Sequence, residues 1–210
     1  AIPPTRIEVN AAAASAALIV DGERVLAMRA IVGEKKTPTP ILVSEVKTIV
    51  INPPWVVPES IIRKEILPAL ARRPDYLEKN RMRWIDGQLV QEPGEKNSLG
   101  RIKFEFANPF HVYLHDTPYR SLFARDERAR SHGCVRLEKP VDLAEWLLER
   151  DPAWPRERIE QAIADGATLR IPLRNSIPVI IAYWTSFVDA DGTVEFRNDI
   201  YGREIRLLAA

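Results

Sequence analysis

The 210-residue sequence contains a single cysteine, Cys134, so no disulfide can form within the chain. The fold must therefore be held together by its apolar core. Hydrophobic residues make up 46% of the sequence and charged residues 28%, which excludes a wholly disordered chain. One free thiol does not by itself identify the compartment in which the protein works.

The sequence also lacks a surplus of one charge, because 30 Lys and Arg against 29 Asp and Glu leave a net charge of +1. A protein that binds nucleic acid electrostatically needs a large basic surplus, so we expect no nucleic-acid partner. No apolar run approaches the roughly 20 residues that span a bilayer. The nearest candidate, Ala11–Val20, is shorter and has no basic leader, so it predicts neither a membrane span nor a signal peptide.

Glycine is scarce, with nine residues against 17 prolines, and the prolines are spread along the chain rather than gathered in a linker. We therefore expect one domain over residues 1–210. Short apolar runs rich in β-branched residues predict strands in the first fifty residues. These predicted strands are Thr5–Val9, Ala17–Val20, Arg24–Ile31 and Ile41–Ile51. The pair Asp21-Gly22 predicts a hairpin turn between the second and the third.

Residues 53–97 have a different character and predict a helical insertion. The apolar period over Ile61–Ile66 is helical, and Pro68 should end it. A second short helix is expected over Asp75–Arg81. The insertion has too few apolar residues to bury a core of its own, so we expect a mobile cap rather than an independent domain.

Strands return after the insertion, with helices set between them. The expected strands are Arg101–Phe106, His111–His115, Thr168–Ile171, Pro178–Val188 and Thr193–Phe196, and the expected helices are Val141–Arg150 and Arg156–Ala164. Asp191-Gly192 predicts the last turn. The pattern as a whole is typical of a mainly β (α+β) domain.

Two histidines lie in the predicted strand His111–His115. Because alternate side chains of a strand share a face, His111, Tyr113 and His115 would face a cleft while Val112 and Leu114 face the core. The alternative is a pair of edge-strand histidines without a function.

The third histidine lies two residues before the cysteine. Gly133 lets the backbone at Cys134 approach a ligand closely and point amide hydrogens outward, as an oxyanion site requires. A thiol beside imidazoles is the usual arrangement for nucleophilic catalysis, in which histidine lowers the thiol pKa and carries protons. A small buried cysteine in a loop is the alternative. The polar neighbours Ser131, His132 and Arg136 argue against burial in an apolar core.

A zinc site is a further alternative, because His111, His115, His132 and Cys134 could together supply four ligands. Ligands four residues apart converge on a helix, however, and this segment is predicted as a strand. No glutamate lies between the histidines as it does in zinc proteases. We therefore expect neither a metal nor another cofactor.

The segment Ser131–Leu137, SHGCVRL, resembles the signature of the L,D-transpeptidase catalytic domain, the YkuD-type domain of bacterial cell-wall enzymes. The upstream segment Tyr113–Pro118, YLHDTP, resembles the second motif of that family. Further likeness to its large Gram-negative branch, which carries a capping insertion, lies in Thr37–Pro40, Asn52–Pro58, Gly94–Gly100 with Lys103-Phe104, and Asp199–Arg203. Asp116 follows the upstream histidine where many members have Gly, although this branch shares the Asp.

The resemblance implies a YkuD-type β-sandwich or barrel with 53–97 as an inserted capping subdomain. It also implies that Cys134 attacks a peptidoglycan stem peptide, forms a thioester and passes the acyl group to an amine of a second stem. His115 would be the base, with His132 activating the thiol or guiding the amine. Backbone amides of Gly133 and Cys134 would stabilise the oxyanion.

By the same resemblance, substrate would contact Arg136, Ser131, Tyr113 and Trp55, although an ion pair for Arg136 and core packing for Trp55 stay open. The partners would be donor and acceptor stem peptides. The protein would be a monomer that is exported to the periplasm. Two alternatives remain. One is an L,D-carboxypeptidase or crosslink-cleaving hydrolase that uses the same cysteine, and the other is a catalytically silent wall-binding module.

Overall fold

The structure is a computed structural model that describes residues 2–149, 152–188 and 192–204. Its strands are β1 (Arg6–Asn10), β2 (Ser15–Val20), β3 (Glu23–Gly33), β4 (Leu42–Ile51), β5 (Trp55–Val56), β6 (Met82–Ile85), β7 (Gln88–Gln91), β8 (Ile102–Phe106), β9 (Leu114–His115), β10 (Ala129–Ser131), β11 (Val135–Leu137), β12 (Leu169–Ala182), β13 (Ser186–Val188) and β14 (Val194–Phe196). Its helices are α1 (Glu59–Ile61), the π-helical turn η1 (Ile62–Ile66), α2 (Leu67–Arg72), α3 (Tyr76–Lys79), the 3-10 turn η2 (Arg120–Ala124), α4 (Pro140–Leu148) and α5 (Arg156–Asp165).

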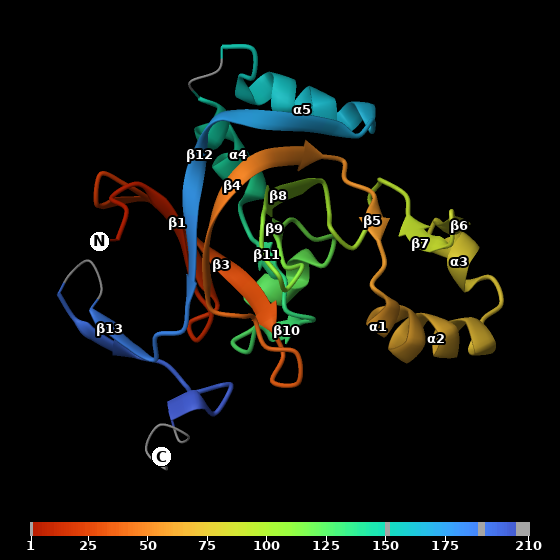
Figure 1. Ribbon diagram of the computed structural model, residues 1–210, viewed down its shortest axis with the longest axis horizontal. Coiled ribbons are helices and arrows are strands. Elements are labelled where there is room, and N and C mark those ends of the chain that lie inside the picture. Colours follow the sequence, from red (N-terminus) through yellow and green to blue (C-terminus); the bar gives the residue numbers. More distant parts are fainter. Residues whose placement is uncertain (1, 150–151, 189–191, 205–210) are drawn as a thin grey trace.

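The main sheet closes on itself. Its strand order is β10-β3-β11-β9-β8-β4-β12-β1-β2, and β2 also pairs with β3, so the sheet forms a barrel from which β10 extends (Figure 1). Closure removes the exposed strand edges through which open sheets associate. The pairs β1–β12, β9–β11 and β10–β3 are parallel, and the other pairs are antiparallel. The predicted mainly β fold with helices is confirmed.

The barrel interior is filled by alternating side chains, as the period of a strand requires. In β8, for example, Ile102, Phe104 and Phe106 are buried while Lys103 and Glu105 between them are half-buried. Helices α4 and α5 lie at one end of the barrel and add their apolar faces to the same core (Figure 1). Over the described residues, no helix is long and apolar enough to cross a membrane.

The predicted hairpin at Asp21-Gly22 is confirmed, because β2 and β3 pair antiparallel across it and both turn residues have positive φ. The separate strands predicted over Thr168–Ile171 and Pro178–Val188 are wrong. Residues 169–182 form one strand, β12, whose pairing with β4 shifts between Pro172 and Ile177, and β13 begins later. Of the last predicted turn, Asp191 lies outside the described residues.

Pro68 does not end the helix of the insertion, contrary to the prediction. Helical structure runs from Glu59 to Arg72, because η1 just before the proline is wound as a π-helix. Within it the Leu67 amide donates to the carbonyl of Ile62, five residues back. Proline lacks an amide hydrogen and collides with the carbonyl four residues earlier in an α-helix, and the wider turn accommodates it.

The insertion is also not wholly helical, because β5, β6 and β7 form a separate sheet in the order β5-β7-β6. The hairpin between β6 and β7 turns at Asp86-Gly87, where both residues have positive φ. This pair is the same type of turn signal as Asp21-Gly22. No hairpin is predicted at Asp86-Gly87 from the sequence, because the apolar period over Ile61–Ile66 favours helix for the insertion.

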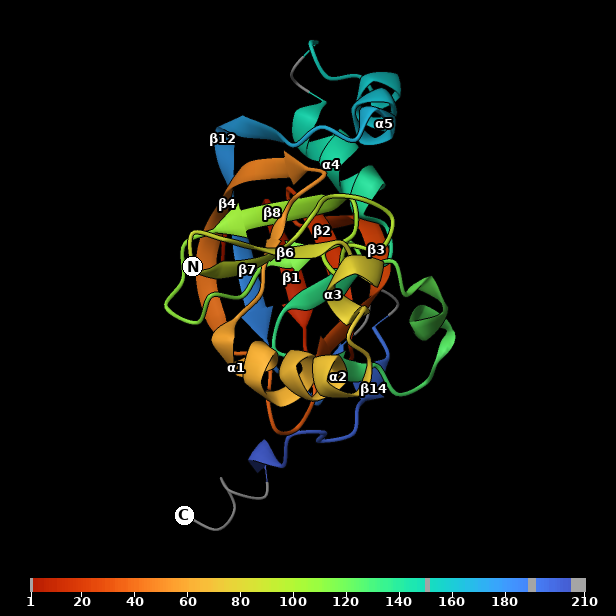
Figure 2. The same ribbon diagram turned by 90° about the vertical axis from the view of Figure 1, so that its right-hand side faces the viewer.

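The insertion has a small apolar cluster of its own, so the expectation that it has too few apolar residues for one was wrong. The cluster contains Val57, Ile61, Ile66, Met82 and Leu89, all buried. Two of these residues lie in helical segments, two in strands and Val57 directly after β5, so no single run of the sequence shows them. Figure 2 shows the insertion lying across one side of the barrel.

Candidate functional site

A cavity of about 430 Å³ lies where the insertion meets the barrel strands next to Cys134. The insertion contributes one wall, lined by Trp55, Pro58, Ser60, Ile61, Glu65, Ile66, Tyr76, Asn80, Met82 and Gln91. The rest of the lining is Ser98, Leu99, Phe110, His111, Val112, His115, Tyr119, Ser131, His132, Cys134 and Arg136. The cavity therefore gathers all three histidines and the one cysteine of the chain.

The pairing of β9 with β11 brings the two sequence motifs together. These short parallel strands place Val135 opposite Leu114 and Arg136 opposite His115. The Val135 amide donates to the Tyr113 carbonyl at 3.0 Å. Cys134, one residue before β11, is thereby held beside the strand that carries His115.

His115 is a buried imidazole with one ring nitrogen already engaged. Its Nδ1 lies 2.5 Å from the carbonyl oxygen of Asp116. Because a carbonyl oxygen only accepts, we assign the ring hydrogen to Nδ1, so the lone pair of the neutral ring is on Nε2. Burial, with the nearby charge of Arg136, lowers the pKa of His115 to about 3. The carbonyls of Asp116 and Leu99 both raise the pKa of the ring, but less than burial lowers it. The ring is therefore neutral at pH 7.

This burial predicts a pH effect on stability. Unfolded histidine has a pKa of about 6.5, so between pH 6.5 and 3 the unfolded chain binds the proton more tightly. His115 should therefore make the folded state lose up to about 1.4 kcal/mol per pH unit as the pH falls through that range. Urea denaturation at several pH values, compared between the wild type and His115→Gln, should show a shallower pH slope for the variant. Equal slopes would contradict a buried neutral ring.

The thiol of Cys134 is also uncharged. Burial raises its pKa, and the Tyr113 amide and the positive charges of Lys103 and Arg136 oppose this only in part. The sequence hypothesis was that histidine lowers this pKa. With a neutral imidazole and a raised thiol pKa, the sulfur must instead give up its proton as it attacks.

Ser131 shapes the turn that presents the cysteine. Its buried hydroxyl donates to the Cys134 carbonyl at 2.5 Å and accepts from the Gly133 amide at 3.2 Å. Gly133 has φ of 111°, a backbone conformation that residues with a Cβ rarely adopt. Of the two amides expected to stabilise an oxyanion, Gly133 is thus engaged inside the turn. The Cys134 amide donates to no acceptor within the part of the chain that the structure describes.

Hydrogen bonds of Thr39 hold the Ser131–Cys134 turn to the barrel, and Tyr201 supports Thr39. From the sequence, neither residue is assigned to the site. Thr39 Oγ1 donates to the Gly133 carbonyl at 2.9 Å and accepts from the Gly33 amide at 2.8 Å. The Tyr201 hydroxyl donates to the Gly33 carbonyl at 2.7 Å and accepts from the Thr39 amide at 3.2 Å. The sequence signal was present in Thr37–Pro40 and Asp199–Arg203, but only as likeness without an assigned role.

Arg136 is half-buried and brings a positive charge to the cavity wall. Its Nε has no hydrogen-bond partner among the described residues. Burial lowers its pKa, but an arginine guanidinium stays protonated in proteins. A buried donor without a partner is costly, so this nitrogen is a candidate for binding an anionic group of a ligand.

His132 and Glu65 connect the Ser131–Cys134 turn to the insertion. Nε2 of His132 lies 2.5 Å from Oε1 of Glu65, and both side chains are about half-exposed. Glu65 was not among the candidates, because the sequence gives no sign that residues 67 positions apart meet here.

The strand predicted over His111–His115 is wrong except for its last two residues. Asn108 closes a turn instead, since its Oδ1 accepts from the amides of Phe110 and Val112 at 3.1 Å each. His111 lies in this turn with φ of 54° and still lines the cavity. Tyr113 is outside the cavity lining, and the centroid of its ring lies 3.8 Å from Nζ of Lys103.

The described residues form no cluster of side chains that could bind a metal ion. No three His, Cys, Asp or Glu side chains among them come together as metal ligands would. His115 faces a backbone carbonyl and His132 faces a single carboxylate.

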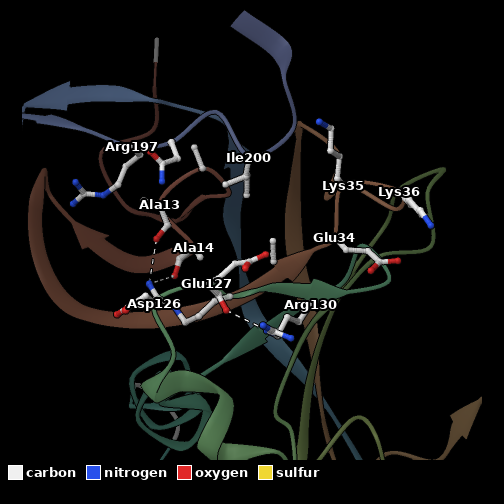
Figure 3. Close-up of a pocket in the computed structure, with 14 residues that line it drawn as sticks. Ala13, Ala14, Glu34, Lys35, Lys36, Asp126, Glu127, Arg130, Arg197 and Ile200 are labelled. Atoms are coloured by element: carbon white, nitrogen blue, oxygen red, sulfur yellow. Dashed lines mark hydrogen bonds between the residues drawn. The ribbon is translucent and has the colours of Figure 1, made fainter.

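A larger and more open hollow of about 960 Å³ lies at another place, where the 11–14 turn, the 34–36 loop and the 126–130 segment meet (Figure 3). Side chains of both charges line it, among them Glu34, Lys35, Asp126 and Arg130. It has neither cysteine nor histidine in its lining. Nucleophilic chemistry is therefore expected in the smaller cavity.

The chain matches the family model of the L,D-transpeptidase catalytic domain, YkuD, over residues 4–159. It is also similar to a Haemophilus influenzae protein named "Putative L,D-transpeptidase", with 33% identity over 209 residues that cover 89% of this chain and 42% of that protein. The chain thus spans less than half the length of this relative.

Among solved structures, the chain is similar to an L,D-transpeptidase from Mycobacterium smegmatis, with 18% identity and a TM-score of 0.46 over 85% of this chain and 58% of that one. It is also similar to L,D-transpeptidase 3 from Mycobacterium tuberculosis in complex with a faropenem-derived adduct, with 14% identity and a TM-score of 0.44 over 86% and 60%. The family assignment rests on the sequence matches, and by these the chain belongs to the L,D-transpeptidase catalytic domain (YkuD) family.

Proposed function

We propose that this protein is a peptidoglycan L,D-transpeptidase that crosslinks stem peptides through a thioester on Cys134. The observation that carries the proposal is that Cys134 and a neutral His115 line one cavity, with His115 on β9 and Cys134 directly before the paired strand β11. The family to which the chain belongs supports the same chemistry.

In the first half-reaction the Cys134 thiol gives its proton to Nε2 of His115 as the sulfur attacks a carbonyl carbon. That carbon belongs to the bond between the third and fourth residues of the donor stem. The carbonyl oxygen becomes an oxyanion, which the Cys134 amide stabilises by hydrogen bonding. The carbon–nitrogen bond then breaks, the leaving D-alanine amine takes the proton from His115, and a thioester remains.

In the second half-reaction an amine of the acceptor stem attacks the thioester carbon. The new amide bond forms as the carbon–sulfur bond breaks, and one proton from the amine returns to the sulfur through His115. His132 acts on this acceptor side, next to the nucleophile. Arg136 holds a stem carboxylate through its guanidinium, whose Nε is unpaired among the described residues.

The insertion, residues 53–97, acts in this proposal as a cap over the reacting groups. Its contribution to the cavity lining, including Trp55, supports that role. A cap that excludes water favours attack by the acceptor amine over hydrolysis of the thioester. The substrates are cell-wall peptides, so we propose that the enzyme works as an exported monomer in the periplasm and needs no cofactor.

Incubation with a disaccharide-tetrapeptide tests the proposal. The expected product, by mass spectrometry, is a dimer that has lost one D-alanine. A trimmed tripeptide without dimer would identify the enzyme as a hydrolase. No product at all, with a substrate that a known L,D-transpeptidase converts in parallel, would contradict the proposal and favour a silent wall-binding module.

A further inference from the structure

Two side chains of fixed opposite charge line the cavity. Within the described part of the chain, its lining has one carboxylate, Glu65 from the insertion, and one guanidinium, Arg136 from β11, besides the three histidines. Arg136 suits an anionic group of a stem peptide, but the proposed reaction also needs a cation, because an acceptor amine is protonated near neutral pH. Glu65 has no assigned role in that reaction.

Glu65 is held toward the reacting side of the cavity. Its partner His132 is two residues from Cys134, and the contact between Oε1 and Nε2 is 2.5 Å. His132 engages only one carboxylate oxygen in this contact. The half-exposed carboxylate therefore keeps acceptor capacity for a second donor.

We propose that Glu65, positioned by His132, binds the ammonium group of the acceptor and selects cationic amines over water as the second substrate. This inference rests on the proposed function, since it names the residue that receives the acceptor of that reaction. A charge-assisted hydrogen bond from ammonium to carboxylate fixes the nitrogen beside the thioester.

The protons balance without a further reagent. The bound ammonium loses two protons as it becomes an amide nitrogen. One passes through His115 to the sulfur, which leaves as the restored Cys134 thiol. The other leaves first, to solvent at the exposed side of the Glu65–His132 pair, and this frees the nitrogen lone pair that attacks the thioester carbon. The bond formed is carbon–nitrogen and the bond broken is carbon–sulfur.

The test uses Glu65→Gln, which keeps the shape of the side chain and removes its charge. With disaccharide-tetrapeptide as donor and acceptor, we expect the ratio of dimer to hydrolysed tripeptide to fall about 10-fold or more, the usual effect of losing a charged hydrogen bond. Glu59→Gln is the matched control, because Glu59 lies near the start of the same helical run, pairs with exposed Arg63 and is outside the cavity lining. Its ratio should stay at the wild-type value.

A neutral nucleophile separates charge recognition from a structural role of Glu65. Hydroxylamine, which is largely uncharged at pH 7.5, should intercept the thioester equally well in the wild type and in Glu65→Gln. If Glu65→Gln reacted more slowly with hydroxylamine and with the stem amine by the same factor, the inference would be overturned. Glu65 would then have only a structural role, linking the insertion to the barrel. An unchanged dimer ratio in Glu65→Gln would also overturn it. A wild-type chain that forms no acyl-enzyme would instead overturn the proposed function itself.

Discussion

Replacing Cys134 with alanine should abolish release of D-alanine and formation of dimers from the disaccharide-tetrapeptide. No other thiol in the chain can take over, because Cys134 is the single cysteine of the sequence. The neighbouring His115 and His132 are poor substitutes, since one is buried with its Nδ1 engaged and the other contacts Glu65. We expect turnover to fall below detection, not merely to slow.

The same variant should remain folded. The side chain is small, and the turn that carries it is held by backbone and hydroxyl contacts of Ser131 and Thr39 that alanine does not touch. A loss of about 1 kcal/mol in the free energy of unfolding is typical of such a substitution. Urea denaturation should therefore give a cooperative transition for both proteins, with the midpoint of the variant lowered by no more than about 1 M. Turnover retained by a folded Cys134→Ala protein would rule out the thioester mechanism.

Replacing His115 with alanine should slow acylation by about 10²–10⁴-fold, the usual effect of removing a general base. The thiol of Cys134 is neutral because burial raises its pKa, so without His115 the base proposed to take its proton as the sulfur attacks is missing. The effect should fall on the rate of acylation at saturating donor.

His111→Ala is the matched control, because His111 lines the same cavity but lies in the turn closed by Asn108 rather than on β9. Acylation rates of both variants, measured with one reactive donor, decide the assignment. A larger loss for His111→Ala than for His115→Ala would reverse it.

The local pattern of the sequence predicted the parts of the fold that depend on neighbours along the chain. Alternating apolar residues gave the early strands, and Asp21-Gly22 gave their turn. The prediction failed where distant contacts decide the structure. β9 is only two residues long because Asn108 closes a turn just before it, and the π-helical turn carries a helix past Pro68.

In the candidate site too, the local sequence predicts the reactive residues but not the distant contacts that bring them together. Cys134 and His115 stood out because their residue types and spacing already suggest nucleophilic chemistry. Their meeting depends on the β9–β11 pairing, which only the closed barrel sets. Glu65 and Thr39 reach the Ser131–Cys134 turn from elements far away in the sequence, and Tyr201 in turn holds Thr39. No local pattern indicates such contacts.

The most direct test of the account is the intact mass of the protein after treatment with a carbapenem. Opening of the lactam ring by the Cys134 sulfur adds the whole inhibitor, because the ring nitrogen takes the thiol proton as the carbon–nitrogen bond breaks. We expect a single adduct on the wild type, equally with and without EDTA, and none on Cys134→Ala. A zinc ion on the sulfur would block the reaction until it was removed. An adduct that forms only after EDTA, or one that persists on Cys134→Ala, would contradict the account.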